Sequence, residues 1–132
     1  MRVGLWMTLC GIAALGLMSC ADSGADALGV GAACTDDAMC ASYAASDSPV
    51  LVCLTAFKGG YCGLQGCVDN TDCPESSACV AMDDASYCFR QCLDKAECNE
   101  NRTEDDAANC SSSVTFVDPE TDGKACVPPS GQ

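Results

Sequence analysis

The chain has 132 residues, of which 14 are cysteine and none is histidine, and its formal net charge at pH 7 is −13. Without histidine the ordinary Ser-His and Cys-His nucleophile systems are excluded, so we expect no catalytic residues and no cofactor. The excess of acidic residues predicts repulsion from nucleic acid and from anionic lipid. The composition therefore favours a non-enzymatic protein.

The first 19 residues have the composition of an export signal. Arg2 precedes an uncharged run from Val3 to Met18, and the run ends in Leu17-Met18-Ser19-Cys20. An ordinary secretory signal peptide fits this segment. A membrane-spanning helix fits it less well, because the run is shorter than the roughly 20 apolar residues that cross a bilayer.

Leu17, Ser19 and Cys20 match the lipobox of bacterial lipoproteins, and the segment resembles that family. In these proteins diacylglycerol is attached to the cysteine sulfur, and the signal peptide is cleaved directly before that cysteine. The resemblance implies cleavage between Ser19 and Cys20 and a lipid anchor on Cys20. Ala21 resembles the sorting signal of outer-membrane lipoproteins, so we expect the outer membrane or cell surface rather than the inner membrane.

Two segments without cysteine are expected to lack structure of their own. Residues 21–33, which follow Cys20, are small and glycine-rich, and the stretch 20–33 is therefore interpreted as the lipidated cysteine with a flexible tether. Residues 127–132 form a short tail that we expect to fray.

The cysteines between these segments indicate a disulfide framework formed in an oxidising compartment. We expect a small disulfide-rich fold of three consecutive four-cysteine modules, at 34–62, 67–88 and 92–126. In every group five residues separate the first two cysteines, which indicates a repeat. The groups are Cys34, Cys40, Cys53 and Cys62; Cys67, Cys73, Cys79 and Cys88; and Cys92, Cys98, Cys110 and Cys126.

Each module is expected to contain a short helical turn and a β-hairpin. Asp36, Asp69 and Asp94 stand two residues after the first cysteine of each group, where a carboxylate can cap a helical turn. Asp72 and Glu97, three residues after two of these aspartates, complete a capping-box pattern. The hairpins are expected at 51–57 turning at 58–60, at 79–82 turning at 83–84, and at 114–117 turning at 119–123.

The second group, Cys67-Val68-Asp69-Asn70-Thr71-Asp72-Cys73-Pro74 running on to Cys79 and Cys88, resembles the four-cysteine units of Dickkopf-type N-terminal regions and of cysteine-rich bacterial lipoproteins. This resemblance implies a disulfide-stapled interaction module rather than an activity. Four cysteines permit three pairings. Of these we favour bridges from first to third and from second to fourth within each module.

Metal binding has one candidate among the acidic residues. Asp118, Glu120 and Asp122 alternate before Gly123, as at the start of an EF-hand calcium loop. Position twelve of that loop is Pro129, where a bidentate glutamate is required, so a turn is the favoured interpretation. Thiolate metal clusters are disfavoured because the chain has neither Cys-x2-Cys pairs nor histidine.

We expect a lipid-anchored, extracytoplasmic protein that acts as a binding or structural module of the cell envelope. Its partners are the membrane, through the anchor, and an unidentified protein or cation. The alternative is a secreted or anchored protease inhibitor that presents the loop Lys58-Gly59-Gly60. A calcium-binding surface protein is a further alternative.

Overall fold

The computed structural model describes residues 29–43 and 49–131, in which short helices and antiparallel strands alternate. The elements in chain order are α1 (Asp37–Ala41), β1 (Val52–Cys53), β2 (Cys62–Gly63), the 3-10 helix η1 (Asn70–Asp72), β3 (Ser77–Met82), β4 (Ala85–Cys92), α2 (Lys95–Cys98), the 3-10 helix η2 (Glu104–Asp106), β5 (Asn109–Ser111), β6 (Thr115–Phe116) and β7 (Lys124–Val127).

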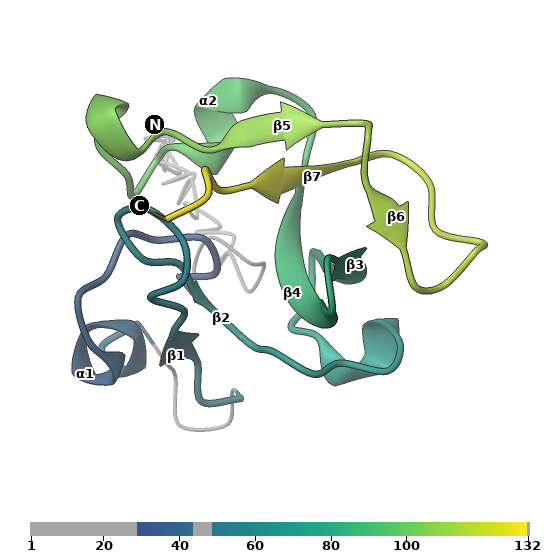
Figure 1. Ribbon diagram of the computed structural model, residues 1–132, viewed down its shortest axis with the longest axis horizontal. Helices are drawn as coiled ribbons and strands as arrows, with labels where there is room; N and C mark the ends of the chain where they lie inside the picture. The colour runs from purple at the N-terminus through teal and green to yellow at the C-terminus, as the bar shows by residue number, and fades with distance from the viewer. Residues whose placement is uncertain (1–28, 44–48, 132) are drawn as a thin grey trace, which may run out of the picture.

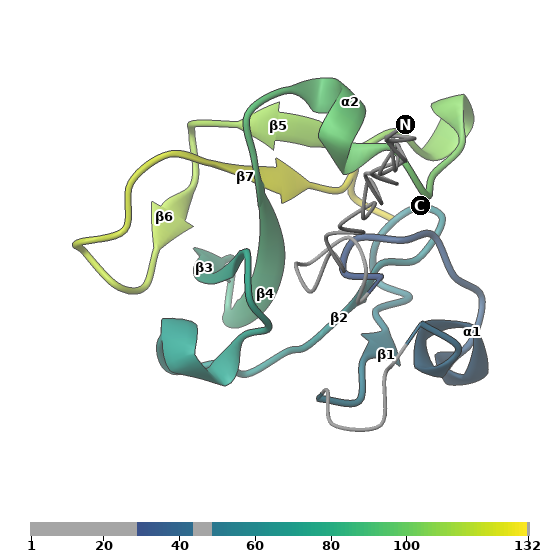
Figure 2. The same ribbon diagram turned by 180° about the vertical axis from the view of Figure 1, so that it is seen from behind.

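Two antiparallel sheets organise the described residues. A five-stranded sheet has the order β5-β7-β4-β3-β6, and a separate two-stranded sheet is formed by β1 and β2. The long strand β4 is central, because it pairs with β3 along most of its length and with β7 at Gln91 and Cys92. Figure 1 shows β4 between β3 and β7, and Figure 2 shows the same arrangement from behind.

The hairpin predicted in the second group is confirmed. Met82 of β3 pairs with Ala85 of β4, so the turn consists of Asp83 and Asp84. Asp83 has a φ of 52°. A two-residue hairpin turn requires positive φ, which aspartate tolerates better than most residues.

The three predicted aspartate caps are confirmed. Of the two predicted capping boxes only the one in the second group is formed, because Glu97 accepts from the N–H of Leu93 and not from that of Asp94. Asp36 accepts a hydrogen bond from the backbone N–H of Met39 at 3.1 Å, and Asp94 accepts one from Glu97 at 3.1 Å. Asp69 caps η1 and forms a complete capping box with Asp72. The repeated aspartate therefore starts a helical turn in each cysteine group.

Six disulfides join the twelve cysteines, and every bridge stays within one group. They connect the first cysteine to the third and the second to the fourth, which is the pairing that we favoured. The pairs are Cys34–Cys53, Cys40–Cys62, Cys67–Cys79, Cys73–Cys88, Cys92–Cys110 and Cys98–Cys126.

The hairpin predicted in the third group is wrong. β6 does not pair with the strand that follows its turn but extends the sheet beside β3, with Phe116 opposite Val80. β7 lies instead between β5 and β4. An isolated two-stranded hairpin is only marginally stable in water. At the edge of the sheet, by contrast, Phe116 packs against the main core. The second and third cysteine groups thus share one sheet, while the first group keeps its own.

The flanking segments are more ordered than the sequence predicted. Within the predicted tether, Val30 and Ala32 are buried, and the Gly31 N–H donates to the carbonyl of Cys62 at 2.9 Å. In the predicted tail, the Gly131 N–H donates to the carbonyl of Ala56 at 3.0 Å. Both segments add backbone pairing to the first group, so the tether can include at most the residues before 29.

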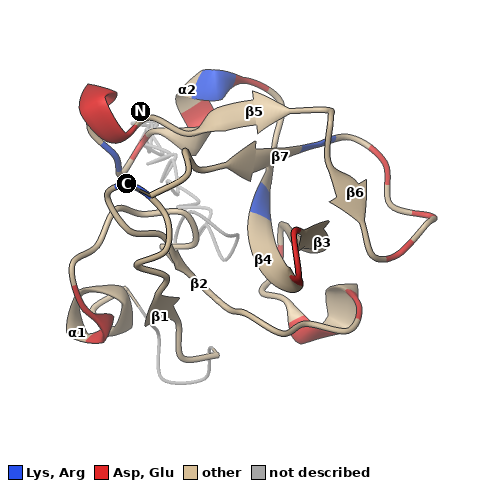
Figure 3. Cartoon of the chain, viewed as in Figure 1, with Lys and Arg blue, Asp and Glu red and all other residues tan. Residues whose placement is uncertain are grey.

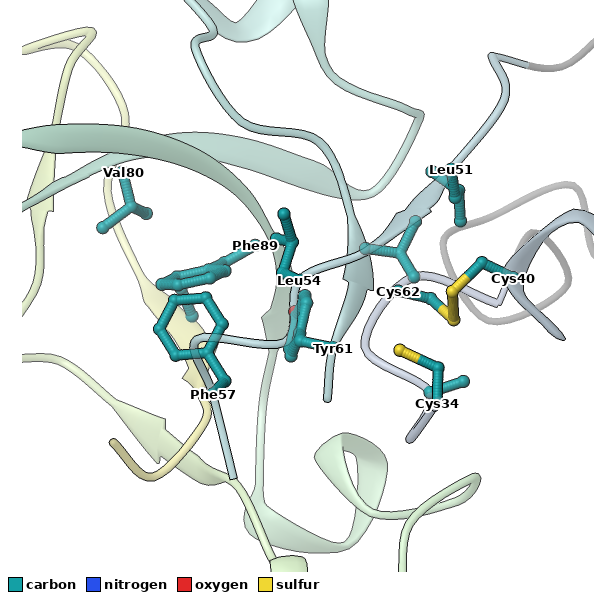
Figure 4. Packing of buried hydrophobic residues seen from close by; sticks show 12 residues of the cluster. Cys34, Cys40, Leu51, Leu54, Phe57, Tyr61, Cys62, Val80 and Phe89 are labelled. Carbon is teal, nitrogen blue, oxygen red and sulfur yellow. A yellow bond between two sulfur atoms is a disulfide. The ribbon is translucent and has the colours of Figure 1, made fainter. Parts of the chain in front are cut away.

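The main core is centred on aromatic rings. Phe57, Tyr61 and Phe89 meet edge to face, with ring centroids 5.1 to 6.1 Å apart, and Tyr87 stacks on Phe89. Such geometries suit the charge distribution of aromatic rings. Figure 4 shows the rings of Phe57, Tyr61 and Phe89 beside Leu54, together with the Cys40–Cys62 bridge of the same cluster. Disulfides and aromatic rings therefore share the interior.

Candidate functional site

The loop considered for protease inhibition, Lys58-Gly59-Gly60, is held against the body of the protein. The Cys34 N–H donates to the carbonyl of Gly59 at 2.9 Å, and a Cβ at Gly60 would overlap the carbonyl oxygen of Cys34. The Lys58 ammonium donates to the carbonyl of Asp105 at 2.6 Å and lies 4.0 Å from Asp106 Oδ1. An inhibitory loop presents its side chain to a protease, whereas this lysine contacts its own chain.

Arg102 holds the same loop from the other side. Its guanidinium donates to the carbonyls of Gly31 at 3.1 Å, Gly60 at 2.8 Å and Lys58 at 2.9 Å, and its Nε donates to Asp106 at 2.8 Å. The guanidinium also lies 5.8 Å from the centre of the Tyr61 ring. We call this arrangement the Arg102 clamp. It joins the third cysteine group to the first and to the segment before it.

The electrostatics of the clamp follow from its burial. Desolvation lowers the pKa of Arg102, while Tyr61 and Asp106 act in the opposite direction. Burial raises the pKa of Tyr61, whose hydroxyl accepts a hydrogen bond from the Arg90 N–H at 3.1 Å. A phenol with a raised pKa stays protonated at neutral pH. The hydroxyl therefore fastens β4 to the first group and is not poised for proton transfer.

Arg90 plays a comparable part next to α2. Its side chain is 9% exposed, donates to the carbonyl of Glu97 and lies 3.7 Å from the carboxylate of Glu100. Both contacts are made through Nη1 of this buried guanidinium. The contacts tie β4 to the helical turn of the third group.

The calcium candidates Asp118, Glu120 and Asp122 lie in the loop between β6 and β7. Asp118 accepts a hydrogen bond from the Glu120 N–H at 3.0 Å, which is an ordinary turn contact. Asn70 reaches this loop from η1, donating to Thr121 Oγ1 at 2.6 Å and approaching Asp118 Oδ2 at 3.5 Å. The loop is thus docked through Asn70 rather than arranged around a cation.

The three carboxylates are not brought together. Within residues 29–43 and 49–131, the groups of three potential ligand atoms that lie within 4.8 Å of one another are all cysteine sulfurs. These sulfurs belong to disulfides, and a disulfide sulfur lacks the thiolate that binds metal.

The surface of the described residues is acidic over several elements. Figure 3 shows acidic positions on α1, near η1, in the turn between β3 and β4, on η2 and in the loop before β7. Asp69 has a lowered pKa, mainly because the Thr71 hydroxyl donates to its carboxylate at 2.5 Å. The carboxylates are dispersed, which suits a solvated surface that repels other anions.

A shallow depression lies beside α2. It has a volume of about 350 Å³, and its lining includes Ser76, Leu93, Glu97 and Lys124. Leu93 is 81% exposed at this place, and its N–H donates to the Glu97 carboxylate at 2.6 Å. The Glu97 carboxylate is therefore engaged by the backbone of its own chain.

Sequence reasoning missed the residues that connect the groups, namely Tyr61, Asn70, Arg90 and Arg102. The sequence offered one signal, which is the scarcity of basic residues in this acidic chain. In the structure Arg90 is buried and Arg102 is half-buried. Ser19 and Cys20, the predicted cleavage and lipidation positions, lie outside the described residues.

Comparisons of the chain with protein-family models, with curated proteins and with solved structures found no match. Across the part of the chain that the structure describes, no helix has both the length and the apolar character needed to cross a membrane.

Proposed function

We propose that the protein is a bacterial lipoprotein anchored through Cys20, whose extracytoplasmic part is a non-enzymatic binding or structural module of the cell envelope. Two features support an extracytoplasmic site. Leu17-Met18-Ser19-Cys20 matches the lipobox, and the six disulfides are typical of oxidising compartments. The disulfide framework is the observation that carries the proposal.

A binding or structural role is favoured over catalysis because the buried and half-buried polar side chains bind the protein's own backbone. The guanidinium of Arg102, the hydroxyl of Tyr61 and the side chain of Arg90 all contact backbone atoms of their own chain. A catalytic group needs to reach a substrate. The protease-inhibitor alternative is disfavoured because Lys58 is engaged by Asp105 and Asp106.

The extracytoplasmic part is organised as three repeats at 34–62, 67–88 and 92–126. Each has an aspartate-capped turn and two bridges with the same pairing. The chain has 19 acidic and 6 basic residues, so the proposed partner is a basic protein surface or a cation rather than nucleic acid. The outer membrane or cell surface is the proposed location.

Lipidation is tested by the intact mass of the native protein purified from bacterial membranes. We expect a chain that begins at Cys20, carries acyl groups and has no free thiol among the other cysteines. The variant Cys20→Ser is expected to lose membrane attachment. A Cys20→Ser protein that is still processed at this position and still membrane-bound would contradict the proposal.

A further inference from the structure

The described residues begin close in sequence to the proposed anchor. Gly29 and Val30 already belong to the fold, because Val30 is 3% exposed and Gly29 accepts a hydrogen bond from the Ala32 N–H at 3.0 Å. At most residues 21–28 separate Cys20 from this point. Eight residues span no more than roughly 28 Å when fully extended. An acylated Cys20 therefore keeps the fold near the membrane surface.

The chain enters the fold beside α1. A Cβ at Gly29 would overlap the ring of Tyr43, which follows α1, so the two residues are in direct contact. Asp37 of α1 accepts a hydrogen bond from the Cys53 N–H of β1 at 2.8 Å. Figures 1 and 2 show α1 and β1 next to each other at one end of the molecule. We call this end, with α1, Tyr43 and residues 49–53, the entry face.

Exposed apolar side chains belong to the entry face. Met39 on α1 is 43% exposed, Tyr43 is 36% exposed and Val50, just before β1, is 68% exposed. Apolar atoms that remain in water favour contact with another apolar phase. Tyrosine in particular suits the boundary between lipid headgroups and acyl chains, because its ring is apolar and its hydroxyl is polar.

The charges of the entry face limit the kind of lipid. Residues 29–53 contain no lysine or arginine, while Asp36 and Asp37 are exposed on α1. Anionic headgroups would be repelled rather than attracted. A zwitterionic phospholipid surface avoids this repulsion and still offers apolar contact.

We propose that the entry face lies against zwitterionic phospholipid in the membrane that holds Cys20, with Met39, Tyr43 and Val50 in contact with the lipid interface. The inference rests on the proposed function, since it needs the acyl anchor. Three partly exposed side chains are too few to hold the protein on a membrane alone. The short link to Cys20 raises their local concentration at the surface and makes the contact persistent.

The test uses tryptophan as a reporter of lipid contact. The chain contains a single tryptophan, Trp6, which is lost when the signal peptide is removed before Cys20. We would prepare full-length variants Met39→Trp and Val50→Trp from bacteria and place the acylated proteins in phosphatidylcholine vesicles containing brominated lipid. Val68→Trp is the matched control, because Val68 is 75% exposed in the second cysteine group.

Bromine quenches tryptophan on contact, so quenching reports proximity to the acyl chains. We expect at least twofold stronger quenching at positions 39 and 50 than at position 68, and weaker quenching at position 50 when phosphatidylglycerol replaces half of the lipid. Equal quenching at all three positions, or a blue-shifted but unquenched Val50→Trp, would overturn the inference. The second result would identify a protein partner as the occupant.

The intact mass of each sample separates the two proposals. A Val50→Trp protein that carries lipid on Cys20 and floats with the vesicles, yet shows no quenching, would refute the entry-face contact and leave the lipoprotein proposal standing. A mass without acyl groups on Cys20 would refute the proposed function, and the inference with it. The variant Cys20→Ser with Val50→Trp is expected to show no quenching.

Discussion

Replacing Arg102 by alanine should weaken the link between the third cysteine group and the first. The guanidinium donates four hydrogen bonds to backbone carbonyls, on Gly31, Lys58, Gly60 and Asp106. Hydrogen bonds with one charged partner contribute roughly 1.5–3 kcal/mol each in buried positions. The side chain is half-buried, so water replaces part of what is lost. We therefore expect Arg102→Ala to lower the free energy of unfolding by about 3 kcal/mol.

The conservative variant Arg102→Lys separates geometry from charge. Lysine keeps the charge but cannot place several donors in one plane, so it should restore less than half of the loss. Lys95→Ala is the matched control, because it removes the same charge from an exposed position on α2. The assay is unfolding by guanidinium chloride with the disulfides intact, monitored by the near-UV circular dichroism of the tyrosines.

Amide exchange adds a local measurement to the denaturation experiment. In Arg102→Ala the amides of Gly31, Cys34 and Cys62 should exchange faster, because they donate between the segments that the clamp holds together. The amides of β3 and β4 should change little. An Arg102→Lys protein as stable as wild type, or an Arg102→Ala loss no larger than that of Lys95→Ala, would refute the reasoning.

Three further predictions concern the bridges, a cap and a turn. Reduction should abolish the circular dichroism of the fold, because each bridge closes a loop of 12 to 28 residues and stabilises the fold by about 3 kcal/mol. A chelator should leave the circular dichroism unchanged, and loss of structure on chelation alone would contradict this prediction. The pKa of Asp69 is lowered in the fold, so its contribution to stability is present above the pKa of the unfolded chain and is lost as the pH falls through the lower folded value. Thermal melts should therefore show a smaller loss of stability below about pH 4 in Asp69→Asn than in wild type, and parallel curves would count against the cap. Gly60→Ala should lower the free energy of unfolding more than Gly123→Ala in denaturation experiments. Both glycines have positive φ, but of the two only Gly60 would place its Cβ against a backbone atom, the carbonyl oxygen of Cys34. Equal losses of unfolding free energy would show that this contact is unimportant.

Local features of this fold could be predicted from the sequence. The caps at Asp36, Asp69 and Asp94 depend on residues three positions apart, and the turn at 83–84 depends on two residues that tolerate positive φ. Such contacts form between chain neighbours, so their sequence signals are short and recognisable. The confinement of the bridges to their groups could be predicted because each group keeps its cysteines close in sequence, whereas the spacing alone leaves three pairings open in each group.

Long-range features could not be predicted in this way. The pairing of β6 with β3 joins residues about 35 positions apart, and two short strands carry too little pattern to identify a partner. The contact between Arg102 and Gly31 spans 71 positions and ends on a carbonyl, which every residue possesses. A side chain that binds backbone atoms leaves no signature at the residue that it binds. The Arg102 clamp could not be predicted for this reason.

The confinement of each bridge to its own cysteine group has a consequence for the order in which an exported chain can mature. A protein translocated from its N-terminus exposes Cys34 to Cys62 before Cys67 appears, and both bridges of that group can close at once. In the proposed export, a later group that emerges after these bridges have closed meets no free thiol in the earlier groups, which disfavours mispairing between groups. The shared sheet and the Arg102 clamp can form only after the last group has emerged. Under the proposed export, covalent closure can therefore proceed in chain order, and the noncovalent joining of the groups comes last.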